Sequence, residues 1–215
     1  MRSMANTITL SRIPFLIGIV ILLYVGTPQV QIITAGLVLL LIFMDTLDGL
    51  VARHRKEVGM LGSKLDIAVD RIVEMVLWVV YAQLGLISVA IPIIVVIRGG
   101  LVDTVRSFSL VWGETPFGIM RTKWGRRLVA SGFMRSIYGA AKAVAFCLLA
   151  LTLGLRGLWA GTAAPGWTDV VGIVAVVASW VAAALCVVRG VPVLWEARSL
   201  LRDLDSQMTE QTVQK

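Results

Sequence analysis

The chain has 215 residues, of which 58% are hydrophobic, and its mean hydropathy is +0.87. This composition lies far above that of a soluble domain and indicates an integral membrane protein with a single domain, residues 1–215. The formal charge of +7 does not indicate nucleic acid, because the basic residues lie in short runs between apolar segments, where an anionic membrane surface is the expected partner.

Six apolar segments, most of them about as long as a bilayer requires, follow one another along the chain. They are expected at residues 13–25, 30–52, 63–86, 88–111, 133–155 and 168–192. Residues 1–12 are polar to mildly amphipathic and are expected to lie along the membrane surface. The sequence therefore predicts an all-α integral membrane fold with six transmembrane helices and an N-terminal surface helix.

The connections between these segments alternate in charge. Residues 53–64 and 113–132 contain four Lys or Arg residues each, whereas the connections on the opposite side contain only Arg156. By the positive-inside rule, both termini are cytoplasmic. We expect the protein in the cytoplasmic (inner) membrane.

Four aspartates lie at the ends of two apolar segments. Asp45 and Asp48 are three residues apart, and Asp66 and Asp70 are four apart, so each pair shares one face of its helix. Counted from the cytoplasmic boundary at about 1.5 Å per residue, the two pairs reach similar depths on antiparallel helices. Four carboxylates in a bilayer need a cation among them, and oxygen ligands suit Mg²⁺, Mn²⁺ or Ca²⁺.

The stretch from Asp45 to Asp70 follows the pattern D-x2-D-G-x2-A-R-x8-G-x3-D-x3-D. This pattern resembles the signature of the CDP-alcohol phosphotransferases, membrane enzymes of phospholipid synthesis, and every fixed position is filled. The resemblance implies that a phosphatidyl group moves from a CDP-linked lipid, CDP-diacylglycerol, to an alcohol, with release of CMP. It also implies Mg²⁺ or Mn²⁺, expected as two ions, a site that opens to the cytoplasm, and a homodimer.

The same resemblance implies a role for each signature residue. The expected metal ligands are Asp45, Asp48, Asp66 and Asp70, and Asp70 is also the expected general base. The CDP donor is expected to contact Asp48, Gly49, Ala52, Arg53 and Gly62. Small residues leave room for the nucleotide, and Arg53 offers a planar fork to phosphate. The alternative, interhelical ion pairing with Arg53, Arg71 or Glu74, explains neither the glycines nor the spacing.

Three residues ahead of the first span, Asn6, Thr9 and Arg12, have the spacing N-x-x-T-x-x-R. They resemble the start of the phosphatidylglycerophosphate synthases within the family, which implies contacts with the CDP donor. The alternative is a capped surface helix in which Arg12 extends toward the membrane surface.

Cations on two later segments predict a pocket for an acceptor phosphate, consisting of Arg98, Arg106, Arg135 and Lys142. The spacing of Arg98 and Arg106 resembles the glycerophosphate-using branch, although pairing with Asp103 is an alternative. Residues 139–143 (GAAKA) depart from that branch's G-K-x-K-T element. Glycerol 3-phosphate is the expected acceptor, and an inositol phosphate or another alcohol is the alternative.

A different class of protein, a cation-binding transporter, also places carboxylates within a membrane. A transport pathway would need polar residues across the full membrane thickness, yet residues 75–83 and 147–155 are nearly all apolar. The sequence therefore favours a membrane transferase whose partners are the lipid donor, a small phosphorylated alcohol and membrane lipids.

Overall fold

The computed structural model describes residues 4–54, 60–111 and 131–213, and these residues form helices joined by short connections. Their helices are α1 (Met4–Val25), α2 (Pro28–His54), α3 (Met60–Gln83), α4 (Ala90–Val111), α6 (Gly132–Leu158) and α7 (Gly166–Val213). The all-α prediction is confirmed for the described residues. Each expected segment overlaps one helix.

The N-terminal surface helix is not a separate element, because α1 runs without a break from Met4 to Val25. Arg12, which would extend to the surface in such a helix, is instead buried. Its ion pairs with carboxylates of other helices, described below, explain why it turns inward. The first apolar segment is accordingly longer than the sequence suggested, since the residues expected at the surface belong to the same helix.

In the described part of the chain, four helices are long and apolar enough to cross a membrane. Their qualifying segments are Thr7–Val25, Pro28–Asp45, Phe133–Leu158 and Gly166–Trp195. Helices α3 and α4 carry charged residues along their length, whereas most charged residues of α7 lie after Trp195, beyond its apolar segment. That all six helices cross the membrane, and that both termini are cytoplasmic, stay predictions.

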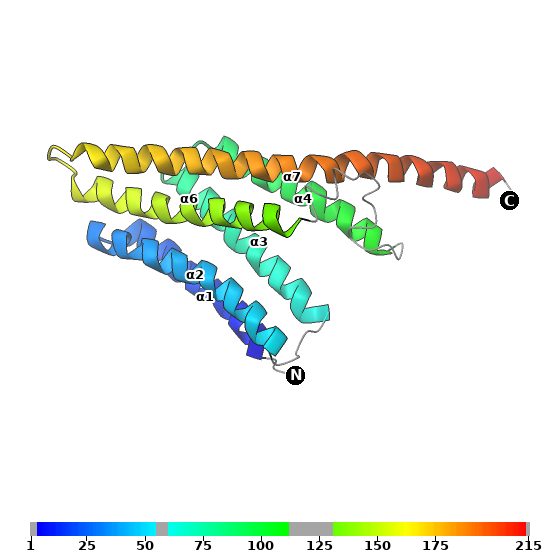
Figure 1. The fold of residues 1–215 in the computed structure, drawn as a ribbon, viewed down its shortest axis with the longest axis horizontal. Coiled ribbons are helices and arrows are strands. Elements are labelled where there is room, and N and C mark those ends of the chain that lie inside the picture. The colour runs from blue at the N-terminus through cyan, green and yellow to red at the C-terminus, as the bar shows by residue number, and fades with distance from the viewer. Residues whose placement is uncertain (1–3, 55–59, 112–130, 214–215) are drawn as a thin grey trace. The chain divides into compact units, whose positions relative to one another are not determined.

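The chain divides into two compact units, the first consisting of residues 1–92 and 141–180. In this unit α1 packs against both α2 and α3 (Figure 1). Trp78 of α3 meets Phe146 of α6 edge-on, with ring centroids 4.6 Å apart. Beside it the buried Tyr81 hydroxyl donates to the Phe146 carbonyl at 2.9 Å. An aromatic core therefore holds α3 against α6.

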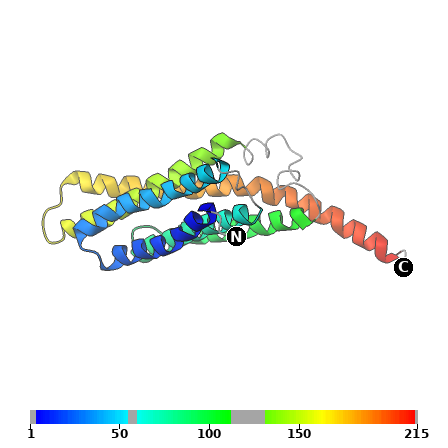
Figure 2. The same ribbon diagram turned by 90° about the horizontal axis from the view of Figure 1, so that it is seen from below.

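Helix α6 also approaches α2 at very short range. A Cβ atom at Gly154 would lie 2.7 Å from the Ile32 nitrogen and 2.9 Å from the Pro28 carbonyl oxygen. Both neighbours are backbone atoms, so only glycine fits at this position. The contact sets the end of α6 beside the start of α2, and the connection from α6 to α7 follows directly (Figure 2).

The second unit consists of residues 93–140 and 181–215. Val102 of α4 and Val193 of α7 form its buried apolar contact, with Val105 and Leu194 packed against them. A Cβ atom at Gly190 would lie 2.7 Å from the Arg98 side chain, so this glycine lets an arginine lie flat against α7.

Candidate active site

One buried arginine of α1 meets three carboxylates from two other helices. The Arg12 Nη1 atom lies 2.6 Å from Asp45 Oδ1 of α2 and 3.8 Å from Asp66 Oδ1 of α3. The Nη2 atom of the same guanidinium lies 3.8 Å from Asp70 Oδ1. Residues far apart in the sequence therefore gather around a single positive charge, and we call Arg12 with these three aspartates the carboxylate cluster.

Exposure within the carboxylate cluster is uneven. The Arg12 side chain is only 1% exposed, whereas Asp45, Asp66 and Asp70 are 40%, 45% and 49% exposed. The carboxylates are thus reached by the guanidinium from one side and remain open to a ligand on the other. Such an arrangement suits the recognition of a charged small molecule or ion.

The charges of the cluster fit a divalent cation. Three ionised carboxylates and one guanidinium leave two negative charges, and carboxylate oxygens are ligands that Mg²⁺ and Mn²⁺ prefer. Among the described residues, no group of three His, Cys, Asp or Glu side chains converges as a ready-made metal site. The aspartates instead spread around the guanidinium, and the fourth signature carboxylate, Asp48, has its side chain outside the described part.

The other predicted donor contacts are partly covered by the structure. Thr9 is buried one turn before Arg12 on α1, so the two share a face of that helix. Gly62 lies near the start of α3 and is partly buried. Five further residues with a predicted donor contact lie outside the part whose side chains are described: Asn6, Asp48, Gly49, Ala52 and Arg53.

A second group of charges lies one helical turn beyond Asp70. Glu74 is 3% exposed, and its Oε2 atom lies 3.0 Å from Lys142 Nζ of α6 and 3.5 Å from Arg71 Nη1. Lys142, which the sequence places in the acceptor pocket, is therefore engaged by a buried carboxylate of α3. This ion pair joins α3 to α6 next to the carboxylate cluster.

In the second unit, Arg98 of α4 lies against Gly190 of α7. Its Nε atom is buried and has no hydrogen-bond partner among the described residues. Arg189, the residue before that glycine, is buried, and its guanidinium carbon lies 5.4 Å from the centre of the Tyr138 ring. Of the other predicted acceptor residues, Arg135 is exposed and the Arg106 side chain lies outside the described part.

Arg189 is not among the residues expected from the sequence. The sequence nevertheless contains an indication of its importance. An arginine within the apolar segment 168–192 is energetically costly unless it contacts a partner. What the sequence does not display is the contact with Tyr138, which lies about fifty residues earlier in the chain.

Comparison with known proteins identifies the group to which the chain is related. The profile of the family described as CDP-alcohol phosphatidyltransferase matches residues 2–188. A comparison with individual curated proteins finds no match. The family match extends from α1 into α7 and includes the whole carboxylate cluster. It covers well over half of the chain, and the chain therefore belongs to the CDP-alcohol phosphatidyltransferase family, as a transferase that moves a phosphatidyl group from a CDP-alcohol.

Proposed function

We propose that the protein transfers a phosphatidyl group from CDP-diacylglycerol to glycerol 3-phosphate and releases CMP. An inositol phosphate or another alcohol is the alternative acceptor. The observation that carries the proposal is the convergence of Asp45, Asp66 and Asp70 on Arg12. Carboxylates and a guanidinium side by side offer both a metal ion and a pyrophosphate the charges that they need.

The three described aspartates, together with Asp48 from the signature, would hold Mg²⁺ or Mn²⁺. When bound, the metal supplies positive charge that neutralises the pyrophosphate of the donor. The two negative charges left over in the cluster favour this binding, and the exposed sides of the carboxylates give a ligand access. We expect two ions to bind.

Asp70 is the proposed general base. Its carboxylate accepts the proton of the acceptor hydroxyl while the hydroxyl oxygen attacks the phosphorus of the phosphatidyl group. The bond from that phosphorus to the bridging oxygen breaks, and CMP leaves with the bridging oxygen. Arg12 is within reach of the same carboxylates and is proposed to hold a phosphate of the donor.

Arg98 is the proposed anchor for the phosphate of the acceptor. A buried guanidinium nitrogen without a hydrogen-bond partner among the described residues favours an anionic ligand at this position. Arg189, whose neighbour Gly190 contacts Arg98, is a proposed addition to this set. The predicted contributions of Arg106, Arg135 and Lys142 stay predictions, as does the homodimer.

The test is an assay of the purified chain in detergent with CDP-diacylglycerol and a panel of acceptors. The panel contains glycerol 3-phosphate, an inositol phosphate, and the two parent alcohols without phosphate. CMP release and the lipid product are measured by mass spectrometry. We expect product with a phosphorylated acceptor, loss of product with EDTA, and recovery with Mg²⁺ or Mn²⁺.

Each failure in this assay has a distinct meaning. Full activity in metal-free buffer would contradict the metal site while leaving the transfer intact. Faster transfer to unphosphorylated alcohols would contradict the acceptor pocket. No lipid product with any acceptor would contradict the proposed function itself.

A further inference from the structure

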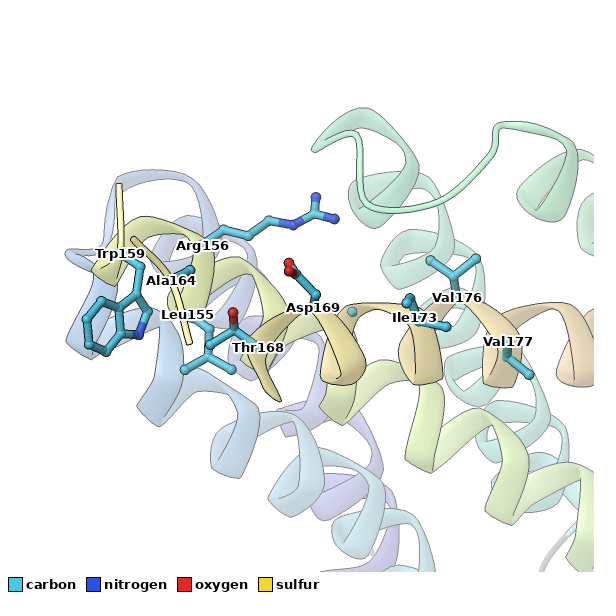
Figure 3. A pocket seen from close by; sticks show the side chains of 10 residues that line it. Leu155, Arg156, Trp159, Ala164, Thr168, Asp169, Ile173, Val176 and Val177 are labelled. Carbon is cyan, nitrogen blue, oxygen red and sulfur yellow. The ribbon is translucent and has the colours of Figure 1, made fainter. Parts of the chain in front are cut away.

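A cavity of about 470 Å³ lies where α6 passes into α7, and it involves none of the residues of the candidate active site. Its walls come from the end of α6, the connecting segment and the first turns of α7 (Figure 3). Four of its lining residues carry polar side-chain groups, namely Arg156, Trp159, Thr168 and Asp169, and the Thr168 hydroxyl already donates to the Pro165 carbonyl.

The cavity lies at the opposite end of the first unit from the carboxylate cluster. Gly157 of α6, next to Arg156, packs against Pro28 at the start of α2. Helix α2 then runs from Pro28 to Asp45, a rise of about 25 Å at 1.5 Å per residue. This distance is close to the thickness of a bilayer's hydrocarbon core, about 30 Å, so the cavity belongs at the other membrane interface.

The polar groups at the rim include one charge of each sign. Figure 3 shows the Arg156 guanidinium and the Asp169 carboxylate on the same side of the cavity, and both residues are exposed. In the described part of the chain no ion pair joins them. The Trp159 Nε1 atom is buried and has no hydrogen-bond partner among the described residues. The cavity therefore offers a cation and an anion at its rim.

Below this rim the wall becomes apolar. Ile173, Val176 and Val177 line it along α7, and Ile173 and Val177 are exposed. They lie within Gly166–Trp195, one of the segments that can cross a membrane, so their expected surroundings are lipid acyl chains. A polar rim at the interface that continues into an apolar wall fits an amphipathic ligand rather than a free ion.

We propose that this cavity binds a zwitterionic phospholipid of the leaflet opposite the carboxylate cluster. Arg156 receives the phosphate, Asp169 receives the ammonium group, and an acyl chain lies along Ile173 and Val177. A phospholipid whose only charge is on its phosphate would leave the Asp169 carboxylate without a positive partner. The site is therefore expected to bind zwitterionic headgroups more tightly than anionic ones. The proposal is independent of the transfer reaction.

The test uses the full chain, purified and analysed by native mass spectrometry with equal amounts of phosphatidylethanolamine and phosphatidylglycerol. A separate arm supplies inorganic phosphate alone. The variants are R156Q, R156K and D169N, and the control is R198Q, which removes an exposed arginine from α7, the helix that contains Asp169. All of these side chains are exposed, so the variants are expected to fold.

We expect the wild type and R198Q to retain phosphatidylethanolamine in preference to phosphatidylglycerol. R156Q should lower retention of phosphatidylethanolamine by about tenfold, because the charge-assisted bonds to phosphate are lost, and R156K should recover most of it. D169N should still retain phospholipid but lose the preference between headgroups. Transfer activity should stay unchanged in all four variants.

The proposal is overturned if R156Q retains phospholipid as R198Q does, or if D169N keeps the headgroup preference. It is also overturned if inorganic phosphate binds at Arg156 and neither lipid displaces it, since the cavity is then a solvent anion site. None of these outcomes bears on the transferase assay, so the two proposals fail separately.

Discussion

The two ends of the first unit use the same kinds of side chain with different charge ratios. At one end a buried arginine, Arg12, is outnumbered by three partly exposed carboxylates. At the other end Arg156 and Asp169 are equal in number, exposed, and not joined to each other in the described part. An excess of negative charge calls for additional cations, whereas a balanced pair suits a ligand that carries both charges. The ratio of charges, rather than their presence, therefore distinguishes the proposed catalytic site from the proposed lipid site.

The strongest expected effect is at the carboxylate end, where D70N removes the proposed base and keeps its size. Turnover should fall about 10²-fold or more, which is the scale of general base catalysis. Binding of the CDP donor should weaken much less, because the other carboxylates and Arg12 remain. Steady-state kinetics with both substrates varied measures this, and near-normal turnover would move the base to another group.

Removing the cation of the cluster should cost stability. R12A leaves three carboxylates without their arginine, and we expect a loss of about 1.5–3 kcal/mol in the free energy of unfolding without metal. Added Mg²⁺ should stabilise R12A more than it stabilises the wild type, and R12K should lie between them. Unfolding in denaturant, with and without Mg²⁺, gives both values. Equal stabilisation of all three proteins by Mg²⁺ would mean that Arg12 and the metal do not share the carboxylates.

Arg98, in the second unit, is the proposed anchor for the acceptor phosphate. Its buried Nε atom lacks a hydrogen-bond partner among the described residues. R98A should raise the KM for the phosphorylated acceptor about tenfold, the scale of one charge-assisted hydrogen bond, and leave the donor KM nearly unchanged. The matched variant R135A, which removes an exposed arginine, should have a smaller effect. R53A should mainly raise the donor KM. An unchanged acceptor KM in R98A would assign Arg98 a structural role.

The smallest expected effect is that of chelation on phospholipid retention, and it separates the two ends most cleanly. Chelation with EDTA should abolish transfer at the carboxylate end but leave phospholipid retention at Arg156 and Asp169 nearly unchanged, because neither charge pairs with a metal there. Native mass spectrometry before and after chelation measures retention. A large loss of retained lipid on chelation would mean that the cavity also depends on a cation.

Much of the helical framework is visible in the sequence because hydropathy is a local property. The segment expected at 88–111 corresponds to α4, which ends at Val111, and the one at 30–52 lies within α2. The meeting of Asp45 with Asp66 and Asp70 also follows from counting residues on antiparallel helices. The length of α7 was not expected as a single helix, although residues 193–213 contain mostly good helix formers.

The features that the sequence did not reveal depend on contacts between distant residues. Arg12 could equally have extended to the membrane surface, and only the position of α1 against α2 and α3 turns it inward. The cation–π contact of Arg189 with Tyr138 depends likewise on how α6 and α7 pack. The cavity at the α6–α7 connection is a space between helices, which no residue pattern encodes locally.

The close contact at Gly154 has a mechanical consequence for the distant end of α2. Backbone atoms of Pro28 and Ile32 lie so close to Gly154 of α6 that the two helices cannot approach further. The contact is therefore a pivot point for α2. From Ile32 to Asp45 the helix forms a rigid arm of about 20 Å. A tilt of only about 5° at the pivot point would then move the Asp45 carboxylate by nearly 2 Å, a displacement comparable to a metal–oxygen bond. Gly154 therefore fixes the point about which any tilt of α2 would displace Asp45.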